Sequence, residues 1–438
     1  MRIRHPSLPP VFVALKHRNY RLLWTGNLIS QSGDWMDLVA FNWLVYEITD
    51  SAIQLAVANA LRAFPALVFT IIGGALADRM QRRKLLFVTQ SVMMFFAFAL
   101  AAIVSLNIVD IWLIYAVALG RGIATAFNQP TRQALISELV TEEDLPNAVA
   151  LNSATVNLTR VIGPTIAAVM IGTVGVTGAF WANAFSFVAV LWSLVLMEFP
   201  DWQPPKRRRN MLADLADGYQ YLRHEAGLRT LVILALLPMV LGQPYQTMLT
   251  VFAKDVFESG GTGLSIMQAA AAIGAVAGAL GVASSRQSTR FHKQMMAGLI
   301  CFGVMLCFFA LSPTMWIALP ILFAVGFTNQ TYQTSNNTMI QMNAAAEYRG
   351  RVLSLLFLRR GLLPLGTVLA GVLTSAFGPR VAVGSMALSL VAIGVLSIPY
   401  ALPTLERMGA TLRKEVVVVD ETAEESATSE PPSQPVGV

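Results

Sequence analysis

Long apolar runs separated by short polar connections constrain this chain more than any other feature of its 438 residues. Residues 91–106 and 381–402 are two such runs. An α-helix rises about 1.5 Å per residue, so about 20 apolar residues cross the roughly 30 Å hydrocarbon layer of a bilayer. Charged residues make up only 13% of the chain, against about 25% in soluble globular proteins. We therefore expect the lipid bilayer to be the solvent for most of the chain.

We expect twelve membrane-spanning helices in two sets of six, which makes the chain an all-α membrane protein. Short matches relate the two sets at an offset of about 200 residues: Arg160-Val-Ile-Gly-Pro matches Arg360-Gly-Leu-Leu-Pro, and Asn128-Gln matches Asn329-Gln. Such a repeat is typical of transporters with two pseudo-symmetric halves and a substrate site between them. The predicted organisation is an N-terminal tail (1–20), a six-helix bundle (21–197), a linker with an amphipathic helix (198–230), a second six-helix bundle (231–403) and a disordered tail (404–438).

Basic residues gather in every second connection between the predicted spans. The N-terminal tail, the connection after the second span and the linker are rich in them, while Lys254 and Arg380 are exceptions in the alternate connections. This positive-inside pattern predicts that both termini are cytoplasmic and that the chain lies in the plasma (inner) membrane. The same connections account for the formal net charge of +6, so we expect no nucleic-acid partner.

The connection after the second predicted span pairs a carboxylate with a dense basic cluster. Residues 73–84 read Gly-Gly-Ala-Leu-Ala-Asp-Arg-Met-Gln-Arg-Arg-Lys. This stretch resembles motif A of the major facilitator superfamily. The resemblance implies a gating role for Gly74, Asp78, Arg79, Arg82 and Arg83.

Further segments resemble the branch of this superfamily that includes enterobactin and macrolide exporters, among them residues 19–24, 43–47 and 214–223. The resemblance implies the major facilitator fold. It also implies secondary active export of a small amphipathic organic molecule, such as a drug, siderophore or metabolite, by alternating access and proton antiport. Two motifs depart from the exporter pattern: Arg121 lacks the Gln-Gly pair of motif B, and the segment after Gly163 has alanines where motif C has glycines. Proton-coupled uptake therefore stays open as an alternative.

The first predicted span has a polar face. Asn27, Gln31, Asp34, Asp37 and Phe41 follow one another at three- and four-residue steps, which places them on one side of a helix. A carboxylate near the bilayer centre costs about 2.5–3.5 kcal/mol on insertion scales, so such residues are functional candidates. Asp34 and Asp37 are the candidates for proton coupling, and a structural ion pair is the alternative.

Helix geometry predicts which buried charges meet. Counting about 1.5 Å per residue from the span ends places Asp37, Arg62 and Arg121 at one depth of about 15 Å, so we expect both arginines to pair with Asp37. Asp34 lies about one turn closer to the cytoplasm without a cation at its depth, so we expect it to exchange a proton. Arg160 is a third buried cation, and the surplus of arginines leaves room for an anionic or zwitterionic substrate. Candidates for the cavity wall are Asn27, Gln31, Phe41, Tyr245, Asn329 and Tyr332.

Residue types that support catalysis or metal binding are scarce. Both cysteines lie in one apolar span, and the four histidines lie in tails and connections without an evident partner. We expect no enzyme activity, no metal and no cofactor. The expected partners are the lipid bilayer, protons and a small amphipathic organic substrate, and the expected state is a monomer. A membrane receptor or scaffold without transport activity is the other alternative, although it would not need charges buried at matching depths.

Overall fold

The computed structural model describes residues 10–77, 80–198, 220–284, 291–344 and 359–428, and these residues form helices without any strand. The first half contains the 3₁₀ turn η1 (Pro10–Lys16) and helices α1 (Arg18–Thr49), α2 (Ala52–Ala77), α3 (Arg82–Ser105), α4 (Ile111–Leu139) and α5 (Leu145–Leu196). The second half contains α7 (Ala226–Leu241), α8 (Tyr245–Val251), the π-helical turn η2 (Phe252–Val256), α9 (Gly260–Ser284), α10 (Phe291–Leu311), α11 (Met315–Asn343), the 3₁₀ turn η4 (Arg359–Leu362), α13 (Leu363–Phe377) and α14 (Pro379–Thr428).

Two glycines with positive φ separate consecutive membrane crossings. Gly175 interrupts α5 with φ 75° and ψ −179°, and Gly378 lies between α13 and α14 with φ 83°. Glycine alone adopts this region readily, so each residue permits a tight reversal of the chain. The two glycines occupy equivalent places in the two halves. Because α7, α8 and η2 form one broken crossing and η4 and α13 form another, the described residues make six crossings in each half.

Seven helices of the described chain are both long and apolar enough to cross a membrane by composition alone. Although they are 32 and 29 residues long, α1 and α11 are not among the seven. Each has buried polar residues, such as Asn27 and Asp37 in α1 and Asn329 and Asn336 in α11. These two helices therefore turn polar side chains toward the protein interior, while the apolar helices cover the bundle.

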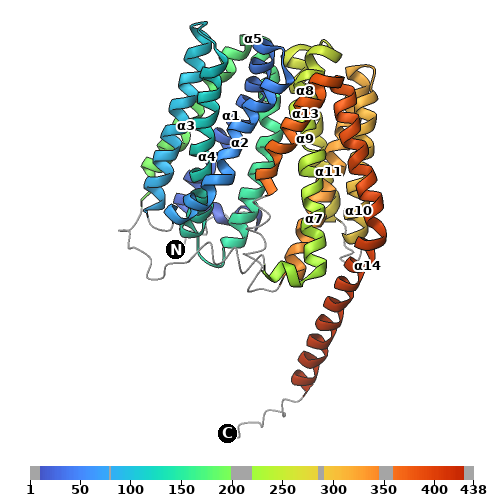
Figure 1. The fold of residues 1–438 in the computed structure, drawn as a ribbon. Helices are drawn as coiled ribbons and strands as arrows, with labels where there is room; N and C mark the ends of the chain where they lie inside the picture. The colour runs from blue at the N-terminus through green and yellow to red at the C-terminus, as the bar shows by residue number, and fades with distance from the viewer. Residues whose placement is uncertain (1–9, 78–79, 199–219, 285–290, 345–358, 429–438) are drawn as a thin grey trace.

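Two helix pairs, α2 with α13 and α5 with α9, form most of the contact between the two halves (Figure 1). Gly371 of α13 lies against Ala52 and Ala56 of α2, and Gly261 of α9 lies against Ile171 of α5. Small residues at such crossings let helix backbones approach closely. Both contacts lie at the end of the bundle remote from η1, which we call the far end; η1 lies at the near end.

The apolar core also differs between the far end and the near end of the bundle. One cluster of buried residues includes members of both halves, such as Leu55 of α2 and Leu264 of α9. A separate cluster at the near end, around Leu86 and Leu194, consists of first-half residues alone. Within the described residues, the first half therefore shares its core with the second at the far end and keeps its own core at the near end.

Ion pairs fasten η1 to the near end of the first half. Asp144 Oδ2 lies 2.7 Å from Lys16 Nζ and 2.7 Å from His17 Nε2. The pKa of Asp144 is lowered to about 2, most by the hydrogen bond from Lys16 and next by the hydrogen bond from His17. In Figure 1, α14 also leaves the bundle at this end, so the first and last described residues lie on the same side. That arrangement agrees with the predicted topology, whereas the cytoplasmic location of this side stays a prediction.

Part of the predicted organisation falls outside the described residues. Most of the linker (198–230) with its amphipathic helix does so, as do Asp78 and Arg79 of the motif A stretch. The C-terminal tail differs from expectation, because α14 continues as a helix to Thr428 where the sequence predicts disorder from residue 404. Between Pro403 and Pro431 the tail contains no proline and many good helix formers such as Glu, Ala, Leu and Arg, which favours this continuation.

Candidate functional site

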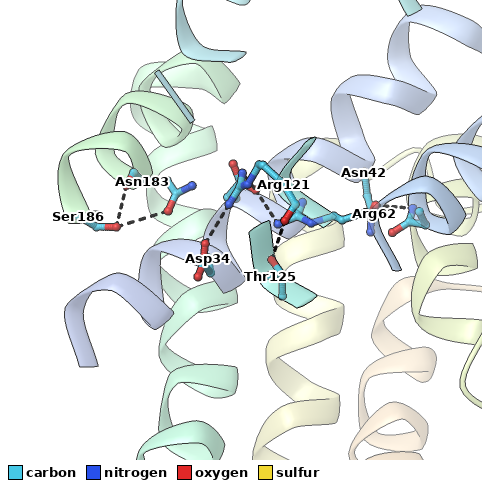
Figure 2. Close-up of polar contacts among 9 residues, drawn as sticks. Asp34, Asn42, Arg62, Arg121, Thr125, Asn183 and Ser186 are labelled. Carbon is cyan, nitrogen blue, oxygen red and sulfur yellow. Dashed lines mark hydrogen bonds and ion pairs between the residues drawn. The ribbon is translucent and has the colours of Figure 1, made fainter. Parts of the chain in front are cut away.

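Four charged side chains from three helices form a cluster inside the first half. Arg121 of α4 donates from Nη1 to Asp37 Oδ2 at 2.6 Å and from Nη2 to Asp34 Oδ1 at 2.9 Å. Arg62 of α2 donates to the same Asp37 oxygen at 3.0 Å. Figure 2 shows Arg121 directed at Asp34, with Arg62 approaching from the opposite side. With both carboxylates ionised, the cluster has two negative and two positive charges and is neutral.

The four side chains differ in exposure. Those of Asp37 and Arg121 are 1% and 3% exposed, whereas those of Arg62 and Asp34 are 20% and 30% exposed. Taking a charge out of water costs several kcal/mol, so the buried Asp37–Arg121 pair depends on each partner for compensation. Asp34 combines a bond to the buried arginine with a partly exposed carboxylate. It is therefore the carboxylate of the cluster best placed to exchange a proton.

The predicted meeting of Asp37, Arg62 and Arg121 is confirmed, but the predicted isolation of Asp34 is wrong. The rise per residue gives the depth of a backbone position only, whereas an arginine side chain reaches beyond the depth of its own backbone. Asp34 and Asp37 are three residues apart on one helix face, so the two terminal nitrogens of one guanidinium reach both carboxylates. Arg121 thus bridges a helical turn of α1 (Figure 2).

Close helix packing positions this cluster. A Cβ atom on Gly122 would lie 2.5 Å from the backbone oxygen of Arg62, so glycine is needed for α4 to approach α2 this closely. The neighbouring Arg121 is thereby held beside Asp37. Phe41, expected in the cavity wall, is instead 1% exposed. The Arg62 guanidinium lies over the Phe41 ring, with Cζ 5.4 Å from the ring centroid. The place of Phe41 in the packed core indicates that this ring supports the ion cluster.

Arg160 of α5 is separate from this cluster. Its guanidinium lies over the ring of Trp35, 5.3 Å from the centroid, and it interacts electrostatically with the phenol of Tyr245 in the second half. Its Nε atom is enclosed and has no hydrogen-bond partner among the described residues. Arg160 therefore lies within electrostatic range of a buried tyrosine of the other half.

The remaining cavity candidates divide into interior polar groups and packing residues. Asn27 and Gln31 are buried on the polar face of α1, and Asn27 Oδ1 and Gln31 Nε2 lack hydrogen-bond partners among the described residues. Asn329 accepts from Gln243 at 3.2 Å. Tyr332 is 1% exposed and donates its hydroxyl to the Leu234 carbonyl, which fixes it in the core of the second half. Gln243 was not predicted, although the Gly-Gln-Pro break between α7 and α8 marks its position in the sequence.

The described residues of motif A connect helices within the first half. Gly74 lies near the end of α2. Arg82 donates to the Ala134 carbonyl and pairs with Glu138 of α4, at 2.9 Å in both cases. Arg83 donates to the Leu194 carbonyl at the end of α5, at 2.8 Å. Cations at helix C-termini stabilise the exposed carbonyl ends, so these two arginines fasten the near end of this bundle.

A polar cluster at the far end joins the two halves. The hydroxyl of Tyr46 in α1 donates to the Asp255 carboxylate in η2, and Lys254 of η2 pairs with Asp50 at the end of α1. Lys254 Nζ also lies 5.4 Å from the centroid of the Tyr46 ring. The π-helical turn presents Lys254 and Asp255 side by side toward α1. Lys254 is one of the two cations that departed from the alternating charge pattern, which was the signal for this contact in the sequence.

No group of histidine, cysteine, aspartate and glutamate side chains suitable for a metal ion occurs among the described residues.

Known proteins resemble this chain along most of its length. The model of a family described as transmembrane secretion effector matches residues 10–426. The chain is 29% identical over 352 residues to the staphyloferrin A transporter of Staphylococcus aureus, which covers 79% of this chain and 87% of that protein. It is 26% identical over 381 residues to the multidrug efflux pump Tap of Mycolicibacterium fortuitum, covering 85% of this chain and 93% of the pump. These matches confirm the predicted resemblance to exporters.

The fold also matches solved structures. A POT family transporter in complex with a thioalcohol-conjugated peptide superposes with a TM-score of 0.72 at 11% identity, over 88% of this chain and 96% of that one. The predicted fold of two six-helix bundles is thereby confirmed.

Proposed function

Because the chain belongs to the transmembrane secretion effector family of the major facilitator superfamily, we propose that it exports a small amphipathic organic molecule across the plasma membrane by proton antiport. Export is supported by the match to the efflux pump Tap, and a transported organic molecule is supported by the matches to Tap and to the staphyloferrin A transporter. The orientation follows the alternating charge pattern, with the near end in the cytoplasm.

Alternating access is supported by the difference between the two ends. The halves share an apolar core and polar contacts at the far end, while the near-end core of the first half is its own. In the alternate state the far-end contacts of Gly371, Gly261 and Lys254 separate and the near ends of the halves come together. Arg82 and Arg83, with Gly74, Asp78 and Arg79 of motif A, bias this equilibrium from the near end.

The bridge that Arg121 forms between Asp34 and Asp37 carries the proposal of proton coupling. Protonation of the partly exposed Asp34 removes its negative charge and weakens its bond to Arg121. Asp37, bound by Arg62 and Arg121 away from solvent, stays ionised and preserves the framework. The proton thereby changes the contact between α1 and α4, which gives the cluster two arrangements that the two sides of the membrane can favour.

Transport in liposomes containing the full-length chain tests this function. A panel with a macrolide, a cationic dye and an aromatic carboxylate should contain a compound that moves opposite to an imposed proton gradient. Asp34→Asn should abolish gradient-driven movement and preserve exchange of that compound across the membrane without a gradient. Glu198→Gln, which removes an exposed carboxylate from the near end, should transport normally.

Other outcomes would decide against the proposal. Movement of substrate and protons in the same direction would indicate uptake by symport. An Asp34→Asn variant that still responds to the gradient would show that Asp34 only orders α1. The absence of flux for every compound, from a folded and reconstituted protein, would favour a receptor or scaffold.

A further inference from the structure

We propose that Arg160, with Trp35 and Tyr245, forms an anion-binding subsite between the two halves, and that the transported molecule carries a carboxylate or another oxyanion beside an apolar or aromatic surface. This inference deepens the proposed function and rests on it.

The charge of Arg160 is not balanced by the described residues. Arg62 and Arg121 both bind carboxylates, and with Asp34 and Asp37 they form a neutral group. Arg160 has an aromatic ring and a phenol as neighbours, and its enclosed Nε donor has no acceptor among the described residues. A positive charge therefore remains at the interface of the two halves.

A bound anion would correct this imbalance. An arginine at the centre of a membrane-spanning helix costs about 2.5–3.5 kcal/mol on insertion scales. A cation–π contact such as that with Trp35 contributes about 0.5–2 kcal/mol and offsets only part of this cost. Guanidinium groups bind carboxylates and other oxyanions through parallel hydrogen bonds, and this geometry makes arginine more selective for them than lysine.

The position of the subsite suits a transported ligand. Arg160 and Trp35 belong to the first half, whereas Tyr245 begins α8 of the second half. Ile171, in the far-end contact, lies eleven residues further along α5, so Arg160 is about 16 Å below that contact along the helix. A ligand bound there touches both halves and lies on the near side of the closed end. Trp35 offers its ring to an apolar or aromatic part of the same ligand.

Binding of three small aromatic probes to the purified full-length chain in detergent tests the subsite. The probes are naphthalene-2-carboxylate, the neutral 2-naphthamide and the cationic 2-naphthylmethylammonium. Ligand-induced shifts in the apparent Tm give their dissociation constants. The wild-type chain should prefer the carboxylate over the other two probes at least tenfold.

Variants connect that preference to the residue. Arg160→Gln should weaken carboxylate binding at least tenfold and leave binding of the neutral probe unchanged, whereas Arg160→Lys should weaken it less. Arg18→Gln, which removes an exposed arginine at the near end, is the matched control and should bind all probes as the wild type does. If Arg160→Gln does not fold, the preference of the wild type and the Lys variant still decides the question.

Equal affinity of the wild type for all three probes, a preference for the cation, or unchanged carboxylate binding by Arg160→Gln would overturn the subsite. Loss of the carboxylate preference in vesicles with phosphatidylglycerol, with the preference kept in detergent and in phosphatidylcholine, would show that an anionic lipid headgroup occupies Arg160 and would also overturn it. These outcomes differ from failure of the transport function. Gradient-driven flux of a neutral or cationic compound without carboxylate binding refutes the subsite alone, and carboxylate binding without any flux refutes transport alone.

Discussion

The pair formed by Asp37 and Arg121 should be strongly coupled in a double-mutant cycle. Asp37 Oδ2 accepts at 2.6 Å from Arg121 and at 3.0 Å from Arg62, and the side chains of Asp37 and Arg121 are almost fully buried. Removing one partner of a buried ion pair costs about 3–5 kcal/mol, because the other charge is left without compensation. Asp37→Ala leaves two arginines with Asp34 as their one remaining carboxylate in the cluster, so we expect a loss near 5 kcal/mol.

Arg121→Ala should cost less, near 3 kcal/mol, because Arg62 still binds Asp37 and the partly exposed Asp34 is less dependent on Arg121. The double variant retains one arginine and one carboxylate and is again neutral. Its loss should fall short of the sum of the single losses by about 2–3 kcal/mol, at the upper end of coupling energies for contacting residues.

Reversible unfolding of the purified protein in mixed micelles with increasing dodecyl sulfate measures these differences. The Arg18–Glu198 pair is the control, because its 2.8 Å separation is similar while its side chains are 51% and 85% exposed. We expect that exposed pair to show a coupling of about 0.2–1 kcal/mol. Additive losses at Asp37 and Arg121, within about 0.5 kcal/mol, would refute the argument that burial makes each charge depend on the other.

Three further predictions concern other parts of the chain. Gly371→Val should slow transport and increase labelling of a cysteine placed at the far end, because the added Cβ would lie 2.7 Å from the Cβ of Ala56. Gly384→Val is the control and should have no effect, because its Cβ would lie 3.6 Å from the nearest neighbouring atom. Equal effects of the two substitutions would contradict this prediction. The pKa of Asp144 in the folded protein is about 2, below its usual 3.8, so its ion pairs stabilise the fold above pH 3.8 and this contribution is lost as the pH falls from there through 2. Asp144→Asn should flatten the pH dependence of the free energy of unfolding in that window. An unchanged pH profile would count against this prediction. Asp78→Asn in motif A should impair transport at normal membrane insertion, measured as flux per reconstituted protein, and normal flux would remove Asp78 from the gating mechanism.

Features that depend only on the position of residues along a helix, such as span length and depth, could be predicted from the sequence. The membrane crossings follow from apolar length, and the meeting of Asp37 with Arg62 and Arg121 follows from the rise per residue. The equivalence of the halves follows from short matches, and the paired glycines Gly175 and Gly378 add to it in the structure.

Properties that depend on side-chain reach, helix rotation or irregular backbone were not predictable. The bond of Asp34 to Arg121 depends on the length of the guanidinium side chain. Phe41 and Tyr332 belong to packed interiors because of the rotation of their helices against neighbours that the sequence does not identify. The charge pattern marks Lys254 as an exception, but the partner of Lys254 at the far end depends on a π-helical turn that the sequence does not indicate.

The sign of the linkage between Asp34 and the anion subsite decides how the two proposals combine. A proton on Asp34 makes the ion cluster more positive, so electrostatics alone would strengthen binding of an anion at Arg160. Proton antiport requires the opposite sign, because the protonated transporter must bind its substrate less tightly. The linkage must then act through conformation: protonation weakens the α1–α4 bond, and Trp35, the neighbour of Asp34 on α1, shifts against Arg160.

Asp34→Asn, which lacks the charge at every pH, should therefore bind naphthalene-2-carboxylate more weakly than the wild type at neutral pH, although its site is more positive. Acidification should weaken binding to the wild type and leave the variant unchanged, and Glu198→Gln should titrate as the wild type does. Tighter binding by Asp34→Asn would mean that direct electrostatics dominates. In that case the proton and the anion would move together as an electroneutral pair, and proton antiport would be refuted.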